Sequence, residues 1–190
     1  ELPLLTDTKI TSHLNFRKKQ LQSLQSVDRG IGSIIRALSS AGRLDSTLFI
    51  FMGDNGLMWG EHRLTGSKDC SYEECIRVPL VIRAPGITPR TESSFALNVD
   101  LLPTILDFAN VTPPPGMNGV SLRPLLANPA TPWRTDLLIE HYQSKGKNFR
   151  GVRNSQWKYV WYPSTNEEEL YNLVSDPYEL TNVSGDASYA

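Results

Sequence analysis

The chain has 190 residues, a length that suits one ordinary domain or a larger unit with a small second one. Hydrophobic residues make up 39% and charged residues 21%, which is typical of a folded globular protein and excludes a disordered chain. The formal net charge of -1 gives no support for nucleic-acid binding, and no apolar run approaches the ~20 residues that span a bilayer.

An apolar pattern of helical period runs through residues 14–38. Hydrophobic side chains recur there at steps of three and four residues, as on one face of an amphipathic helix. Ala41 and Gly42 follow, and glycine is the usual residue where a helix ends in a left-handed conformation. The pattern predicts a long helix that ends near Gly42.

Two short apolar runs follow, at residues 48–52 and 78–83. The first lacks polar alternation, which favours a strand buried on both faces, as in a parallel sheet covered by helices. The second predicts another strand, with Pro79 at its first position or on an edge, because proline cannot donate to a ladder.

A second helix is predicted over residues 101–109, which are apolar at helical steps. Pro103 is tolerated there because the first turn of a helix has unpaired N–H groups in any case. The order helix, strand, loop, strand, helix predicts an α/β layered domain.

The composition changes at the proline-rich residues 128–132. Beyond them, alternating aromatic and polar residues predict strands at 137–140, 149–153 and 158–162, as in an antiparallel sheet with one face in water. We therefore expect two parts: the α/β domain at residues 1–128 and a small α+β antiparallel-sheet subdomain at residues 129–190.

Asp54 and Asn55 directly follow the most apolar predicted strand. In α/β sheets ligands gather beyond the carboxyl ends of strands, and a carboxylate beside an amide oxygen offers the hard donors that calcium or magnesium prefers. Asp-Asn-Gly is also ordinary turn chemistry, so the two residues alone leave a metal site and a plain turn open.

Charged residues cluster in the loop that follows. Lys68 beside a divalent cation would hold a tetrahedral oxyanion, whereas by itself it is equally typical of a solvated loop. His62 is either a substrate contact or a histidine that packs near the site. Glu61, Glu73 and Glu74 are more typical of charges at helix starts than of metal ligands.

Cys70 and Cys75 are the two cysteines of the chain. Their spacing matches no zinc motif, and two thiols alone make neither a disulfide framework nor a metal site. We expect buried or unpaired thiols.

In this loop region the chain resembles the sulfatase family of the alkaline-phosphatase superfamily. Residues 53–64 are similar to that family's strand-end metal motif and the following loop, and Lys68 with residues 72–86 continues the pattern in register. Further matches lie at residues 26–32, 99–104 and 169–179. The similarity covers residues 16–183, and the order and spacing of its fragments make it specific.

The resemblance implies a sulfuric ester hydrolase with an alkaline-phosphatase-like fold. In this family a formylglycine, made from Cys or Ser in a Cys/Ser-x-Pro-x-Arg motif, attacks sulfur while calcium and basic side chains neutralise the sulfate oxygens. Asp54 and Asn55 would hold the cation, calcium or else magnesium. Lys68 would be a catalytic sulfate contact and His62 a substrate contact.

The resemblance also implies partners. The substrate would be a sugar, aryl or choline sulfate, and the family favours export to the periplasm, the extracellular space or the lysosome. The Cys/Ser-x-Pro-x-Arg motif does not occur in the chain, because neither Cys70 nor Cys75 is followed by the required proline and arginine. We expect that motif, further acidic ligands and additional basic residues upstream, in the remainder of the same polypeptide. The 190-residue chain alone is predicted to be inactive.

Three alternatives stay open on sequence grounds. The first is a phosphonate monoesterase or phosphodiesterase of the same superfamily, with similar metal chemistry. The second is a non-catalytic sulfatase-like domain that binds sulfated glycans. The third is a structural α/β domain in which Asp54 and Asn55 form only a turn.

Overall fold

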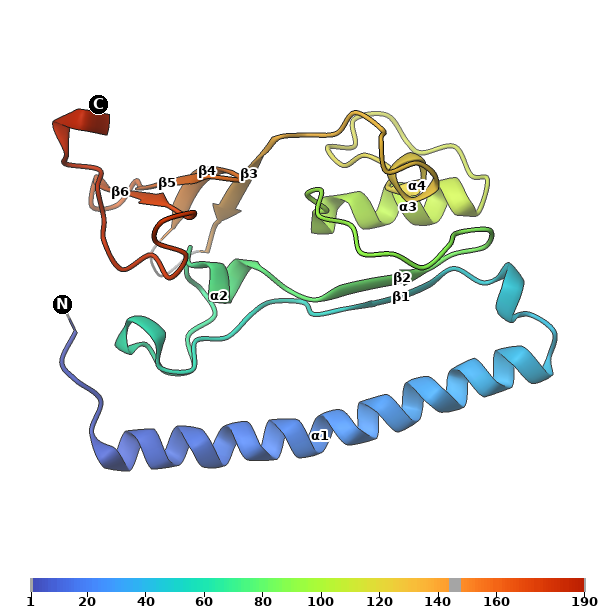
Figure 1. The fold of residues 1–190 in the computed structure, drawn as a ribbon, viewed down its shortest axis with the longest axis horizontal. Helices are drawn as coiled ribbons and strands as arrows, with labels where there is room; N and C mark the ends of the chain where they lie inside the picture. The colour runs from blue at the N-terminus through green and yellow to red at the C-terminus, as the bar shows by residue number, and fades with distance from the viewer. Residues whose placement is uncertain (1, 144–147, 190) are drawn as a thin grey trace. The chain divides into compact units, whose positions relative to one another are not determined.

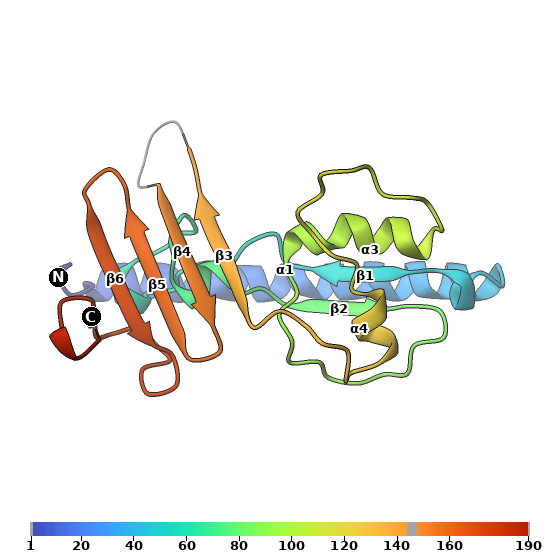
Figure 2. The same ribbon diagram turned by 90° about the horizontal axis from the view of Figure 1, so that it is seen from above.

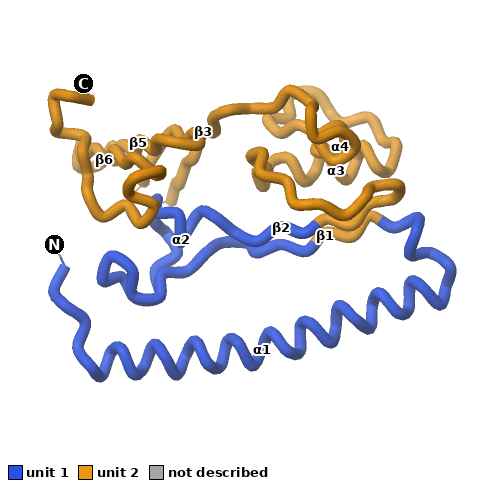
Figure 3. The backbone as a smooth tube through the Cα atoms, in the orientation of Figure 1, with its two compact units in different colours: residues 1–47, 51–81 blue, residues 48–50, 82–190 orange. Residues whose placement is uncertain are grey.

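The computed structural model describes residues 2–143 and 148–189. It divides into two compact units, residues 1–47 with 51–81 and residues 48–50 with 82–190 (Figure 3). The expected boundary between residues 128 and 129 lies within the second unit and stays a prediction.

The first unit begins with α1, Asp7–Ser40 (Figure 1). The Thr6 hydroxyl caps its start by accepting a hydrogen bond from the Lys9 N–H at 3.4 Å. At its end Gly42 takes a φ of +65°, and its N–H donates to the Ser39 carbonyl at 3.0 Å, a glycine-terminated end of the Schellman type. The predicted helix is confirmed, although it begins at the Thr6 cap, well before the apolar stripe.

The apolar stripe of α1 stays accessible to solvent. Within the described residues no side chain of α1 is buried, and Leu14 is 61% and Ile34 53% exposed. An amphipathic helix owes most of its stability to packing of its apolar face. This stripe is therefore the surface of α1 that is suited to packing against further protein.

Strands β1, Phe49–Met52, and β2, Leu80–Arg83, form a two-stranded sheet. They run in opposite directions (Figure 1), and beyond their paired ends the Gly53 N–H donates to the Pro79 carbonyl at 3.1 Å. The prediction of a strand buried on both faces is wrong for the described chain, in which β1 is half-buried throughout. An apolar run indicates a strand but carries no information on the direction of its partner or on what covers it.

Between these strands lie the 3-10 turn η2, Glu61–Arg63, and the short helix α2, Glu73–Ile76. Both glutamates of α2 stand in its first turn, as predicted, where they complement the positive end of the helix dipole. Another 3-10 turn, η1, Leu44–Ser46, links α1 to β1.

In the second unit, the 3-10 turn η3, Asn98–Asp100, leads into α3, Leu101–Phe108, with Pro103 in the first turn as predicted. The fully buried Asp100 carboxylate accepts hydrogen bonds from the Arg134 guanidinium and from the Val120 N–H at 2.9 Å. It thereby ties α3 to the segments that follow it. The short helix α4, Arg123–Ala127, was not predicted, because five residues are too few to show a helical period.

A four-stranded antiparallel sheet completes this unit, in the order β3-β4-β5-β6 (Figure 2). The bounds are β3, Asp136–His141; β4, Phe149–Asn154; β5, Trp157–Tyr162; and β6, Glu167–Asn172. The three predicted strands and their antiparallel pairing are confirmed. β6 was missed as a strand because it opens with three glutamates, which strands disfavour.

The core of this sheet consists of Phe149, Val160 and Tyr162, with Ile139 packed against them. Beneath the closing segment of the chain, the Lys158 ammonium pairs with the Glu179 carboxylate, and both side chains are fully buried. A short 3-10 turn, η4, Ala187–Tyr189, follows. No helix in the described part of the chain combines the length and the apolar character needed to cross a membrane.

Candidate functional site

The candidate metal ligands stand on the turn that follows β1. The Asp54 carboxylate accepts a hydrogen bond from the Asn55 backbone N–H at 2.9 Å, and the Asn55 side-chain amide donates to the Gly56 carbonyl at 2.8 Å. Because Asn55 uses its nitrogen in this way, its side-chain oxygen is the atom suited to a cation. Both side chains are exposed, so the turn presents a carboxylate and an amide oxygen to a ligand.

Gly56 brings the backbone of this turn into close contact with α2. Its N–H donates to the Cys75 carbonyl at 2.8 Å, and a Cβ atom at this position would lie 1.8 Å from the Glu74 carbonyl oxygen. Only glycine permits so close an approach of two backbones. The position of Asp54 and Asn55 is therefore set by the contact between Gly56 and α2.

A hairpin-like loop pairs the segment just before Lys68 with Met58, which follows this turn. The Met58 N–H donates to the Ser67 carbonyl at 2.8 Å, and the Gly66 N–H donates to the Met58 carbonyl at 2.9 Å. Met58 is fully buried beneath the loop. Lys68 directly follows this paired segment and is exposed, so its ammonium group is available to an anion.

His62 lies at the tip of the same loop in an unusual conformation. It takes a φ of 52°, and the next residue, Arg63, a φ of 59°, both in the left-handed region that non-glycine residues rarely adopt. The His62 imidazole stacks on the Tyr72 ring, with the ring centroids 3.7 Å apart and the planes inclined by 9°. Its Nε2 atom is buried without a hydrogen-bond partner among the described residues. Strained backbone and an unpaired buried nitrogen are typical of a residue held ready for a ligand.

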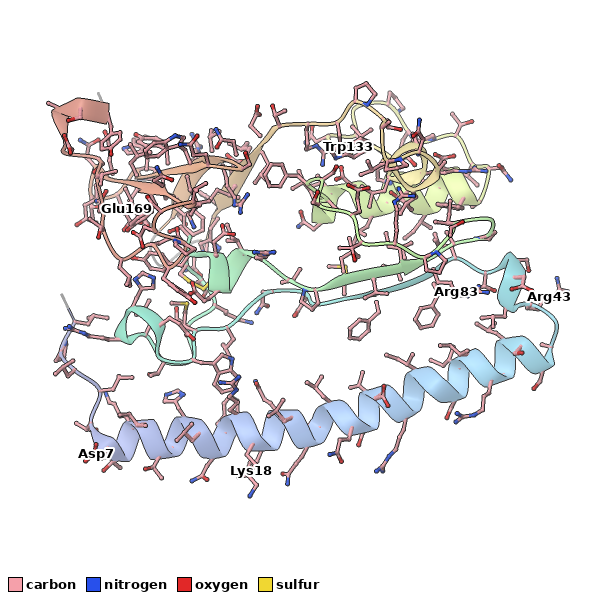
Figure 4. The ribbon with its side chains drawn as sticks, viewed as in Figure 1. Asp7, Lys18, Arg43, Arg83, Trp133 and Glu169 are labelled. Carbon is pink, nitrogen blue, oxygen red and sulfur yellow. A yellow bond between two sulfur atoms is a disulfide. The ribbon has the colours of Figure 1, made fainter. Side chains whose placement is uncertain are left out.

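The two cysteines form a disulfide, which corrects the expectation of unpaired thiols. The Cys75 N–H donates to the Tyr72 carbonyl at 2.9 Å, and this turn brings the Cα atoms of Cys70 and Cys75 to 5.7 Å, within the range for a disulfide. Figure 4 shows the bond in yellow beside α2. Cys75 is buried, as expected. Spacing alone did not reveal the pairing, because the turn that joins the two residues is a feature of the folded loop.

The predicted ligands fit a hard cation in kind but not in number. Among residues 2–143 and 148–189, no group of three or more His, Cys, Asp or Glu side chains is placed to hold a metal ion. Calcium takes ~6–8 oxygen ligands, and Asp54 with Asn55 offers two side-chain groups. These two residues therefore suit part of a calcium site, and the remaining ligands must come from elsewhere.

A hollow lies in the second unit. It has a volume of about 480 Å³, lies at the β3–β4 end of the four-stranded sheet, and is lined by His141, Phe149 and Arg150 among others. Asp54, Asn55, His62 and Lys68 do not line it. We therefore place the candidate site on chemistry and loop geometry, not on this cavity.

Comparison with known proteins identifies the family. A family model described as Sulfatase matches residues 5–111, and one described as N-sulphoglucosamine sulphohydrolase, C-terminal, matches residues 60–190. The N-acetylglucosamine-6-O-sulfatase of Bacteroides thetaiotaomicron is 36% identical over 92% of this chain and 33% of its own length. The human N-acetylglucosamine-6-sulfatase is 32% identical over 94% of this chain and 39% of its own length.

Comparison with solved structures supports the same family. A protein solved in complex with its substrate D-glucosamine-2-N,6-O-disulfate has a TM-score of 0.81 and 36% identity, over 88% of this chain and 36% of that one. A phosphonate monoester hydrolase of Agrobacterium radiobacter has a TM-score of 0.76 and 31% identity, over 86% of this chain and 36% of that one. The chain spans 33% to 39% of the length of these relatives. These matches confirm the resemblance found in the sequence and the α/β fold with a small antiparallel sheet, and the chain belongs to the sulfatase family.

Proposed function

We propose that this chain is the C-terminal portion of a sulfuric ester hydrolase. It contributes metal and sulfate contacts, while the formylglycine nucleophile comes from a preceding part of the same polypeptide. The observation that carries the proposal is the loop system after β1, in which Gly56 contacts α2 next to Asp54 and Asn55, and the paired loop places Ser67, the neighbour of Lys68, against Met58.

Each residue has a distinct task in this proposal. Asp54 supplies a carboxylate oxygen and Asn55 an amide oxygen to calcium, with magnesium as the alternative. When bound, the cation acts as a Lewis acid that neutralises charge on the sulfate oxygens. Lys68 places an ammonium charge against the same sulfate group, and His62 contacts the part of the substrate that carries it.

The substrate class that we favour is a sulfated amino sugar. The N-acetylglucosamine-6-sulfatases of bacteria and mammals support it, and so does the structural relative solved with a glucosamine disulfate. Arylsulfatase of Clostridium perfringens and choline-sulfatase of Rhizobium meliloti, each 33% identical, define the competing ester classes. The disulfide is consistent with an exported protein, because disulfides persist mainly in oxidising compartments.

Turnover by the full-length polypeptide that carries this chain tests the proposal. We expect calcium-dependent release of sulfate from N-acetylglucosamine 6-sulfate, faster than from an aryl sulfate or choline sulfate. Lys68→Ala should lower kcat/KM by about a hundredfold, the scale for loss of one group that stabilises transition-state charge. Lys18→Ala, on the exposed surface of α1, is the matched control and should leave turnover unchanged.

Other outcomes separate the alternatives. The similarity to phosphonate monoester hydrolases makes phenylphosphonate monoesters the second substrate class to assay, and preference for them would favour that activity. Binding of the sulfated sugar without any turnover would favour a glycan-binding domain. Absence of both, with no stabilisation by calcium, would leave a structural role for the Asp54-Asn55 turn. The 190-residue chain by itself is expected to release no sulfate.

A further inference from the structure

The disulfide closes a loop, residues 70–75, that contacts the other parts of the candidate site. At one end it directly follows Lys68 and Asp69. At the other end the Cys75 carbonyl accepts the Gly56 N–H at 2.8 Å, which links it to the turn that carries Asp54 and Asn55. Within it, Ser71 is fully buried, so the loop is packed into the unit.

Tyr72 joins this loop to His62. The two rings are nearly parallel at a centroid distance of 3.7 Å, closer than most aromatic pairs. The left-handed conformation of His62 is unfavourable for a residue with a Cβ atom. Two turn hydrogen bonds span it, from the Arg63 N–H to the Gly60 carbonyl at 3.0 Å and from the Leu64 N–H to the Glu61 carbonyl at 2.9 Å. Stacking on the Tyr72 ring adds to these bonds and holds the side chain.

The surroundings of the His62 ring indicate the effect of its stacking on Tyr72. Its Nε2 atom is buried yet has no hydrogen-bond partner among the described residues, and an unsatisfied buried nitrogen is costly unless a ligand completes it. A ring fixed by stacking presents Nε2 in one direction only. This arrangement lowers the conformational entropy that a ligand must remove on binding.

We propose that Tyr72, held in place by the Cys70–Cys75 disulfide, is a positioning residue that orients the His62 imidazole toward the sulfated substrate. The proposal rests on the assignment of His62 as a substrate contact, and it adds the element that holds this contact in place. Tyr72 acts through the face of its ring on His62 and through no direct contact with substrate. The disulfide limits the freedom of the loop that carries Tyr72.

Kinetics of the full-length enzyme test the role of Tyr72. Tyr72→Leu keeps apolar bulk but removes the ring, and it should raise KM for the sulfate ester about two- to tenfold with kcat little changed, the factor expected for one aromatic pair. Tyr72→Phe keeps the ring that stacks on His62 and should raise KM less than Tyr72→Leu does. In a His62→Gln background, Tyr72→Leu should raise KM no further, because the ring acts through His62. Tyr178→Leu, at an exposed tyrosine, is the control.

Proton NMR of the His62 ring gives a readout that does not depend on activity. Stacking on Tyr72 should shift the imidazole ring protons upfield, and the signals are assigned by their loss in His62→Gln. The shift should vanish in Tyr72→Leu, persist in Tyr72→Phe, and decrease in the variant that combines Cys70→Ser with Cys75→Ser. That double variant should also raise KM.

The possible results distinguish this proposal from the proposed function. An unshifted His62 ring in the wild type, or an active Tyr72→Leu enzyme with unchanged KM, overturns the role of Tyr72. Unchanged KM and ring shift in the double serine variant overturn the role of the disulfide. If the His62 ring protons are shifted upfield but the protein hydrolyses no sulfate ester, the proposed function is refuted. The same result supports the inference that the disulfide-closed loop positions His62.

Discussion

Removing one partner of the Lys158–Glu179 ion pair should destabilise the four-stranded sheet more than any surface change. Lys158 belongs to β5, and Glu179 lies beyond β6 in the closing segment of the chain. Both side chains have 0% relative exposure, so neither charge is solvated by bulk water. Glu179 also takes a left-handed φ of 55°, a conformation that is uncommon for a residue other than glycine.

The size of the expected destabilisation follows from the burial of both side chains. An exposed ion pair contributes at most about 1 kcal/mol, because water screens it. Removing one partner of a fully buried pair leaves the other charge in the protein interior without its counter-charge, which costs about 3–5 kcal/mol. Lys158→Met should therefore lower the free energy of unfolding of the sheet by about 3–5 kcal/mol. Lys158→Met combined with Glu179→Met should cost clearly less than the sum of the two single changes, since it removes both charges.

Hydrogen exchange of the β5 amides in the full-length polypeptide measures this effect locally, where a global melting curve would mix several domains. Lys18→Met, on the exposed face of α1, is the control and should change protection by less than about 0.5 kcal/mol. A loss in Lys158→Met no larger than in that control would refute the reasoning. Additive losses in the double variant would show that the two side chains are not coupled.

Three further predictions concern the turn after β1 and helix α3. Gly56→Ala should abolish calcium-induced stabilisation of the full-length protein, measured as the shift in Tm on adding calcium, because its Cβ would overlap the Glu74 carbonyl at 1.8 Å; an unchanged shift would disprove this close packing. Asp54→Ala should lower the same calcium-induced shift without lowering Tm in the absence of calcium, since the exposed carboxylate is proposed to act on the cation and not on the fold. The Ser121 hydroxyl, which donates to Asp107, and the Arg123 guanidinium hold the pKa of the Asp107 carboxyl below its usual 3.8. A lowered folded-state pKa contributes stability that is present above the unfolded pKa and is lost as pH falls through the folded pKa, so this contribution should fade below about pH 4. Ser121→Ala should raise the Asp107 pKa, as followed by carboxyl-carbon NMR, and an unchanged titration would contradict the assigned cause.

Local patterns predicted most of the regular elements. The helical period before Gly42 and the one around Pro103 gave α1 and α3, since a periodic apolar face requires only near neighbours in the chain. The alternating residues after position 136 likewise indicated β3, β4 and β5. The start of α1 was placed too late, because its first turns depend on the Thr6 cap and not on an apolar stripe.

The pairing of β1 with β2 and the addition of β6 to the second sheet could not be predicted from these patterns. The antiparallel arrangement of β1 and β2 depends on how the chain returns between them, and β6 forms because β5 offers it a partner, in spite of its glutamates. A short apolar run indicates that a segment will be buried, but the segment against which it packs depends on the whole fold.

The candidate site, like the fold, was predicted in part from the sequence and was completed only by the tertiary structure. The sequence by itself determined the family, most of the helical and strand segments, and the candidate residues Asp54, Asn55, His62 and Lys68, because order and spacing along the chain carry that information. Only the tertiary structure decided that Cys70 pairs with Cys75 and that Tyr72 stacks on His62. Such contacts depend on loop conformations stabilised by packing and hydrogen bonds between distant residues, and no local pattern of residue types specifies them.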